Sequence, residues 1–144
     1  MLKKLVFAAL LVLPSLAIAQ SFFFLERYTI PVNQIDATTF ETVDADGAGG
    51  TQHWCAAGIY ASKVLGLKKV FLFIKQPLGP SVTVPGRKGV VFSTEPVPGA
   101  TQSYSEGVRK AGKTFSLSHA SALCWGDYIG DVQIRLANGQ LVWR

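Results

Sequence analysis

Apolar and polar residues alternate most regularly near the C-terminus of the chain. Ile134 and Leu136 alternate with polar residues, and Asn138-Gly139 then supplies the two positive-φ residues of a type I′ turn. A two-residue turn at this point places Leu136 opposite Leu141 and Ile134 opposite Trp143, so that all four share one face. The pattern predicts a β-hairpin with one apolar side.

Shorter apolar segments predict the other strands. Val70–Ile74 is apolar on both faces, which is typical of a central strand, and Gly89–Ser93 is its predicted partner. The segments Gln76–Gly89 and Glu95–Gly107 are rich in Pro and Gly and are expected to be loops. The remaining predicted strands are Phe22–Ile30, which Pro31 ends, Phe40–Val43 and Val108–Leu117.

One long helix and one short helix are predicted between these strands. Thr51 is a suitable N-cap for a helix over Gln52–Leu65, and Gly66 is a suitable stop after it. Ser116 or Ser118 is expected to cap a short second helix. The apolar or small residues of the long helix fall on one stripe, formed by Trp54, Ala57, Gly58, Ala61 and Leu65.

These elements predict an α+β fold in a single small domain. We expect a mainly antiparallel sheet of about five strands, packed by one long and one short helix. The domain is expected to cover residues 20–144, because residues 1–19 have a different character.

The first nineteen residues have the pattern of a cleavable secretory signal peptide. Lys3 and Lys4 precede an apolar segment, and Ala17-Ile18-Ala19 supplies the small residues that a signal peptidase requires. Cleavage is expected between Ala19 and Gln20. The apolar segment is shorter than the roughly 20 residues that a membrane span needs, so no span is expected after cleavage.

The chain has two cysteines, Cys55 and Cys124. An exported protein normally oxidises such a pair, so one disulfide that links the two helices is expected. The chain-entropy model gives this bridge about 4 kcal/mol of stabilisation.

Three other chemistries are alternatives. Cys55 at a helix N-terminus, with His119 and Asp127 downstream, has the residue order of several cysteine hydrolases, but a bridge accounts for both cysteines. His53 and His119 would join Asp44, Asp46 or Asp127 in a metal site, yet the sequence contains no HxxxH or CxxC pair. The Gly47–Gly50 segment lacks the spacing of a phosphate-binding loop. The sequence therefore predicts no metal, no cofactor and no catalytic residue.

The loop before Gly89 is the candidate binding site. A type II turn at Pro85-Gly86 would present Arg87 and Lys88 together, near the hydroxyl groups of Ser81 and Thr83. Such a group of side chains suits a carboxylate, a phosphate or an acidic partner. The alternative is an exposed turn that two charges keep soluble.

Two segments resemble a pattern of small exported bacterial proteins of unknown function. They are Trp54–Ala61 (WCAAGIYA) and Gly79–Arg87 (GPSVTVPGR), and Cys124 fits the partner cysteine of that pattern. The resemblance implies a bacterial exported domain with one disulfide, and it implies no activity.

The charge of the chain excludes one class of partner. The formal net charge is +5, of which Lys3 and Lys4 contribute two, and the basic residues are scattered rather than clustered, so no nucleic acid is expected. We expect a non-enzymatic periplasmic or secreted domain that binds an unknown protein or envelope component. The alternatives are a small cysteine hydrolase using Cys55 and His119, and a periplasmic inhibitor of an envelope-attacking enzyme such as lysozyme.

Overall fold

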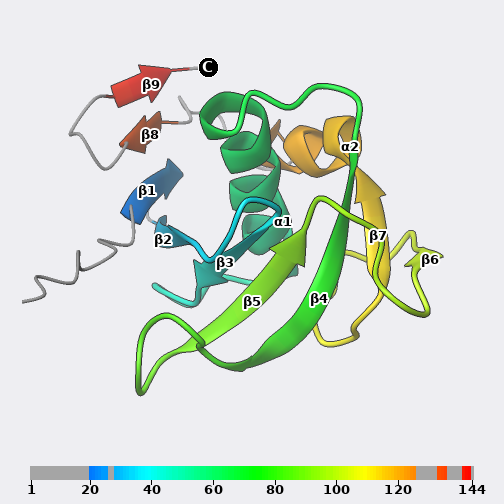
Figure 1. Ribbon diagram of the computed structural model, residues 1–144. Helices are drawn as coiled ribbons and strands as arrows, with labels where there is room; N and C mark the ends of the chain where they lie inside the picture. The colour runs from blue at the N-terminus through cyan, green and yellow to red at the C-terminus, as the bar shows by residue number, and fades with distance from the viewer. Residues whose placement is uncertain (1–19, 26–27, 126–132, 136–140, 144) are drawn as a thin grey trace, which may run out of the picture.

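A mainly antiparallel sheet with two helices on one face forms the fold (Figure 1). The computed structural model describes residues 20–25, 28–125, 133–135 and 141–143. Within these residues the sheet has nine strands in the order β6-β7-β4-β5-β3-β2-β1-β8-β9. The β6–β7 pair is parallel, and the other pairs are antiparallel. The α+β class is therefore confirmed, with more strands than the sequence predicts.

Nine strands and two helices follow one another along the described residues. The strands are β1 (Gln20–Leu25), β2 (Tyr28–Gln34), β3 (Thr39–Val43), β4 (Phe71–Pro80), β5 (Lys88–Ser93), β6 (Thr101–Gln102), β7 (Lys113–Ser116), β8 (Gln133–Arg135) and β9 (Leu141–Trp143). The helices are α1 (Gly50–Ile59), which continues as a π-helical turn (Tyr60–Val64), and α2 (Leu117–Ala122), which continues as a 3₁₀ turn (Leu123–Trp125).

Apolar residues fill the space between the helices and the sheet. The indole of Trp54 on α1 lies with its centroid 5.0 Å from that of Phe92 on β5 and 4.4 Å from that of Phe115 on β7. Phe40 on β3 contacts Tyr60 from the end of the same helix at 4.7 Å between centroids. The predicted helical stripe therefore faces the core, and four of its five members are fully buried.

The long helix begins differently from the prediction but stops where predicted. It begins after Gly49, whose N–H donates to Oε1 of Gln52 at 2.8 Å, while the hydroxyl of Thr51 donates to Glu106 instead of capping the helix. Gly66 stops the helical run with a φ of +69°, as predicted. Ser116 caps α2, because its Oγ accepts from the N–H of His119 at 3.2 Å.

Three predicted loop or strand boundaries are wrong. The predicted strand Phe22–Ile30 is a hairpin of β1 and β2, and Pro31 lies inside β2 because the β2–β3 ladder begins only at Val32. β4 continues through irregular pairing to Pro80, so the predicted long loop shrinks to residues 81–87. The predicted strand over residues 108–117 shortens to β7, because Gly112 before it has a φ of +81°.

The C-terminal hairpin is confirmed in its pairing and wrong in its register. β8 and β9 pair antiparallel, with Ile134 opposite Val142 and Gln133 opposite Trp143. This register differs by one residue from that of a two-residue turn, so Ile134 and Trp143 are not cross-strand partners. The predicted turn at Asn138-Gly139 and residue Leu136 lie outside the described residues, as does the predicted signal peptide.

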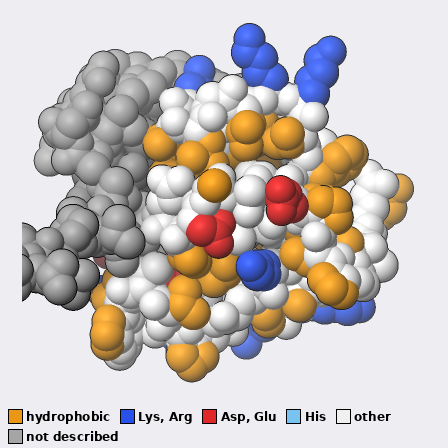
Figure 2. All heavy atoms as spheres, in the orientation of Figure 1, with side chains coloured by type: hydrophobic (Ala, Val, Ile, Leu, Met, Phe, Trp, Pro, Cys, Tyr) orange, Lys and Arg blue, Asp and Glu red, His pale blue; other side chains and the backbone are white. Residues whose placement is uncertain are grey.

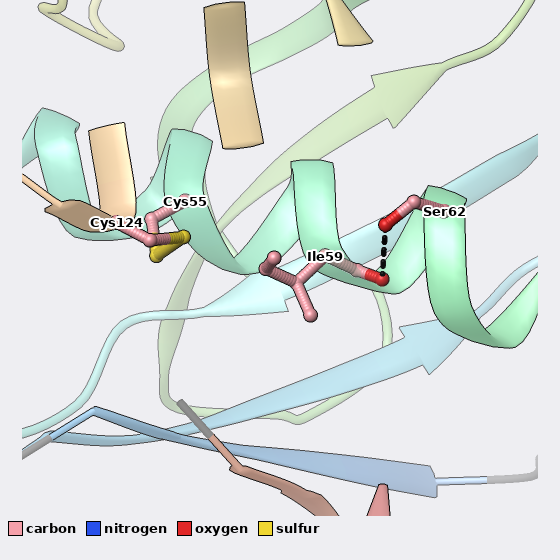
Figure 3. Close-up of a disulfide and its surroundings, with 4 residues drawn as sticks. All are labelled: Cys55, Ile59, Ser62 and Cys124. Carbon is pink, nitrogen blue, oxygen red and sulfur yellow. Dashed lines mark hydrogen bonds between the residues drawn. A yellow bond between two sulfur atoms is a disulfide. The ribbon is translucent and has the colours of Figure 1, made fainter. Parts of the chain in front are cut away.

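The predicted disulfide joins Cys55 of α1 to Cys124, just after α2 (Figure 3). The two Cα atoms are 5.0 Å apart, and the bridge spans 69 residues of sequence. The helices also approach closely at Gly58, where an added Cβ would lie 2.7 Å from the backbone nitrogen of Ser121. The bridge and the glycine together fix α2 against α1.

No helix in the described part of the chain is long and apolar enough to cross a membrane.

Loss of the bridge is expected to destabilise the protein severely. Replacing both cysteines, Cys55→Ala and Cys124→Ala, should lower the free energy of unfolding by about 2 to 5 kcal/mol, measured by urea denaturation. A reducing agent should lower the stability of the wild type similarly and leave that of the double variant unchanged. Equal stability of the wild type with and without reductant would contradict the expectation.

Candidate functional site

The predicted binding loop closes the hairpin of β4 and β5 and extends to the lower left of the molecule in Figure 1. The N–H of Ser81 donates to the carbonyl of Arg87 at 2.9 Å, which holds the two ends of the loop together. The N–H of Arg87 donates to the carbonyl of Val84 at 3.2 Å, and Gly86 has a φ of +79°. These values fit the predicted type II turn with Pro85-Gly86 at its centre.

The carboxylate of Glu41, which is 0% exposed, accepts hydrogen bonds from the inner side of the loop. Its Oε1 accepts from the N–H of Val82 at 2.9 Å. Its Oε2 accepts from the hydroxyl of Ser81 at 2.8 Å, from the N–H of Thr83 at 3.0 Å and from the hydroxyl of Thr83. Two backbone and two side-chain donors from three consecutive residues therefore converge on one carboxylate.

Two further residues complete this arrangement, which we call the Glu41 clasp: Glu41, Ser81, Thr83, Asn33 and Gly89. The side-chain amide of Asn33 donates to the hydroxyl oxygen of Thr83 at 2.8 Å. Gly89 leaves room for the carboxylate, because a Cβ at this position would lie 2.3 Å from Oε1 of Glu41. The clasp therefore needs a residue without a side chain at the start of β5.

The four predicted binding residues divide into two pairs. The hydroxyls of Ser81 and Thr83 face inward to Glu41, so these residues fix the loop rather than offering their hydroxyls to a ligand. Arg87 and Lys88 are exposed, and Nη2 of Arg87 donates to the backbone carbonyl of Asp44 at 2.6 Å. Val82, between the inward-facing pair, is 55% exposed.

A shallow depression lies beside the loop on the sheet face that carries no helix among the described residues. Its volume is about 390 Å³, and its apolar lining includes Val82, Val91 of β5 and Ile35, which is 43% exposed. Asp36 and Lys75 also line it. Figure 2, which has β4 and β5 in front of α1, shows apolar side chains interspersed with acidic and basic ones on this side of the molecule. The outward surface next to the loop is therefore partly apolar.

A second polar cluster lies between β3 and the start of α1. His53 is 0% exposed, and its Nδ1 shares a hydrogen bond of 2.8 Å with the hydroxyl of Thr42. Its Nε2 is 3.6 Å from Oδ1 of Asp44, which is too long for a hydrogen bond, and neither atom has another partner. Burial lowers the pKa of His53, and the negative charge of Asp44 opposes this shift.

The residues of the alternative cysteine hydrolase and metal sites have other partners or lie outside the described residues. The sulfur of Cys55 is bonded to Cys124, and His119 is exposed with its ring packed 4.4 Å from that of Phe115, centroid to centroid. Asp127 lies outside the described residues. Oδ2 of Asp46 accepts from the N–H of Thr29 at 2.8 Å. Among the described residues no three His, Cys, Asp or Glu side chains are grouped so that they would hold a metal ion.

Sequence reasoning missed Glu41, Asn33 and Gly89. The alternation within β3 places Glu41 on the face opposite to Phe40, which normally predicts a solvated side chain. Only the folding of the loop across this face, about forty residues later in the chain, buries the carboxylate. A single sequence carries no local signal of such a contact.

Comparisons with protein-family models, with curated proteins and with solved structures find no match to this chain.

Replacing the carboxylate of the clasp is expected to destabilise the fold. Glu41→Gln preserves the size of the side chain, but it removes the charge and turns an NH₂ group toward the donors of the loop. We expect the free energy of unfolding to fall by about 2 to 4 kcal/mol in urea denaturation. The control Glu95→Gln, at an exposed glutamate, should change it by less than about 0.5 kcal/mol. Similar losses in the two variants would contradict the clasp.

The buried His53 predicts a pH dependence of stability. Its pKa in the folded protein lies below the ordinary value of 6.5, so the unfolded chain binds a proton first as the pH falls. The stability contributed by the neutral imidazole is therefore complete above pH 6.5 and is lost as the pH falls from 6.5 toward the folded-state pKa. Urea denaturation of the wild type at several pH values should show this loss. His53→Asn should flatten the dependence, whereas His119→Asn, at an exposed site, should preserve it.

Proposed function

We propose that this protein is a non-enzymatic binding domain that recognises a macromolecular partner through the loop 81–87 together with Lys88, the first residue of β5. These residues are called the loop 81–88 below. The observation that carries this proposal is the use of a buried carboxylate to hold an exposed loop. Removing a carboxylate from water costs several kcal/mol, and here four donors from the loop offset that cost. The arrangement favours one conformation of a surface segment that the core itself does not require.

A fixed loop is an advantage in binding. A flexible loop loses conformational entropy when a partner orders it, and a loop that is already ordered avoids most of this cost. The residues that the clasp orders present Val82, Pro85, Arg87 and Lys88 to solvent. An apolar side chain next to two cations offers both contact area and charge, which supports recognition of a protein or another envelope component.

We also propose that the domain acts outside the cytoplasm, in the periplasm or as a secreted protein. The sequence of residues 1–19 supports export, and the Cys55–Cys124 bridge is compatible with an oxidising compartment.

One alternative gains support from the same loop. An inhibitor of an envelope-attacking enzyme would need a rigid segment that projects from a stable body, and the loop at the end of the β4–β5 hairpin has this form (Figure 1). The cysteine hydrolase gains no such support, because its nucleophile would be the sulfur of Cys55, which is bonded to Cys124. A free thiolate at this position would require the bridge to open.

Capture experiments with matched variants test the proposed function. The tagged full chain, exported and processed in its own host, is used to recover proteins and envelope components after gentle cross-linking. We expect Arg87→Ala with Lys88→Ala to reduce recovery of the specific partner about tenfold, because two rim charges contribute on the order of 1 kcal/mol or more together. Quantitative mass spectrometry of the recovered material measures the change.

The control for this experiment is a second exposed pair of lysines. Lys68→Ala with Lys69→Ala removes the same charge from the segment between α1 and β4 and should leave recovery unchanged. Both double variants should melt within a few degrees of the wild type, since they alter exposed side chains. The loop has no role in binding if the two variants recover the partner equally well.

A further inference from the structure

The loop 81–88 also constrains what kind of partner it fits, and this inference rests on the proposed function. Its eight residues, SVTVPGRK, contain two cations and no acid. The carboxylate of Glu41 is covered by the loop and already accepts four hydrogen bonds. Asp44, the residue whose backbone holds Arg87, has its carboxylate oxygen Oδ1 3.6 Å from Nε2 of the buried His53. The solvent-facing side of the loop is therefore cationic and apolar.

Arg87 is positioned as well as exposed. Its Nη2 is held by the carbonyl of Asp44, so one side of the guanidinium is anchored to the segment after β3. The guanidinium has five N–H donors in a planar fork, and those not used by the carbonyl are free to form a paired hydrogen bond with a carboxylate. Lys88, the next residue, begins β5 and is held by the pairing of Lys88 with Pro80. Both cations therefore start from fixed backbone positions.

The number of cations in the loop distinguishes a protein partner from a partner with an extended anionic surface, such as a membrane. A membrane surface contributes about 1 kcal/mol per nearby Lys or Arg, and recognition of anionic lipid usually needs clusters of four to eight basic residues. Two cations are too few for that mode. They suffice in a recess, where a carboxylate meets them away from bulk water and each interaction is stronger.

The shape of the loop favours the same conclusion. A closed turn at the end of a long hairpin is convex, and the clasp keeps it so. A flat surface gains nothing from a fixed convex shape, whereas a concave site on a partner matches it. We infer that the partner is a protein with an acidic recess that receives the tip of this loop, Val82 and Pro85–Lys88, with its carboxylates against Arg87 and Lys88.

Charge reversal tests the acidic character of the recess. The probe is the purified protein that the wild type recovers in the capture experiment, titrated by calorimetry against the full processed chain at about 150 mM salt. Compared with the wild type, Arg87→Ala with Lys88→Ala should bind about tenfold more weakly, and Arg87→Glu with Lys88→Glu about a hundredfold or more. The control Lys68→Glu with Lys69→Glu should bind like the wild type.

A zero-length cross-linker tests the contact directly. A carbodiimide joins a lysine amine to a carboxylate that touches it, so Lys88 should be joined to Asp or Glu residues of the partner, and Lys68 and Lys69 should not. Adducts to carboxylates from two separate segments of the partner support a recess.

The outcomes separate this inference from the proposed function. If charge reversal weakens binding no more than alanine does, the site on the partner is not acidic, although the loop remains a binding element. Vesicles with about 30% phosphatidylglycerol at the same salt provide the second comparison. If they retain the wild type but not the charge-reversal variant, the loop binds an anionic lipid surface and not a protein recess. If the capture experiment recovers no partner that depends on the loop, the proposed function itself fails, and this inference fails with it.

Discussion

The position of the loop 81–88 depends on one interaction, the hydrogen bonding of the buried carboxylate of Glu41. The loop lies on the sheet face that carries no helix among the described residues. An ionised side chain that has left water must have its acceptor positions filled, and here all four donors come from three consecutive residues of one loop. The loop therefore cannot move away without returning the carboxylate to water or leaving it unpaired. Gly89 belongs to the same constraint, because any side chain there would occupy the space of the carboxylate.

Different interactions stabilise the two faces of the sheet. On the helix side, aromatic side chains around Trp54 exclude water, and the Cys55–Cys124 bridge lowers the conformational entropy of the unfolded chain. His53 is a fully buried polar side chain on this side, and its hydrogen bond to Thr42 partly compensates its burial. On the face that carries no helix among the described residues, the hydrogen bonds to Glu41 add to the burial of apolar residues such as Phe73 and Val91. The aromatic core and the bridge thus stabilise the body of the domain, while the clasp stabilises one conformation of a surface segment.

The sequence predicts the features that depend on local chemistry. The cap at Ser116, the stop at Gly66 and the turn at Pro85-Gly86 each follow from residue types within a few positions. The pairing of Cys55 with Cys124, 69 residues apart, follows instead from the count, because the chain has only these two cysteines. Features that depend on distant contacts are missed. The hydroxyls of Ser81 and Thr83 look available in the sequence because Glu41, their partner, is about forty residues away. The register of the C-terminal hairpin fails for a related reason: β8 also pairs with β1, at the opposite end of the chain.

The same burial that fixes the loop also argues against a catalytic role for Glu41. A general acid or base must reach the proton that it transfers, directly or through one water molecule. The carboxylate of Glu41 is 0% exposed, and the groups around it are donors of its own chain. Its position instead decides where Val82, Arg87 and Lys88 stand on the surface. A carboxylate that shapes an exposed, positively charged loop without touching solvent is consistent with recognition, because recognition rewards a fixed shape and requires no proton transfer.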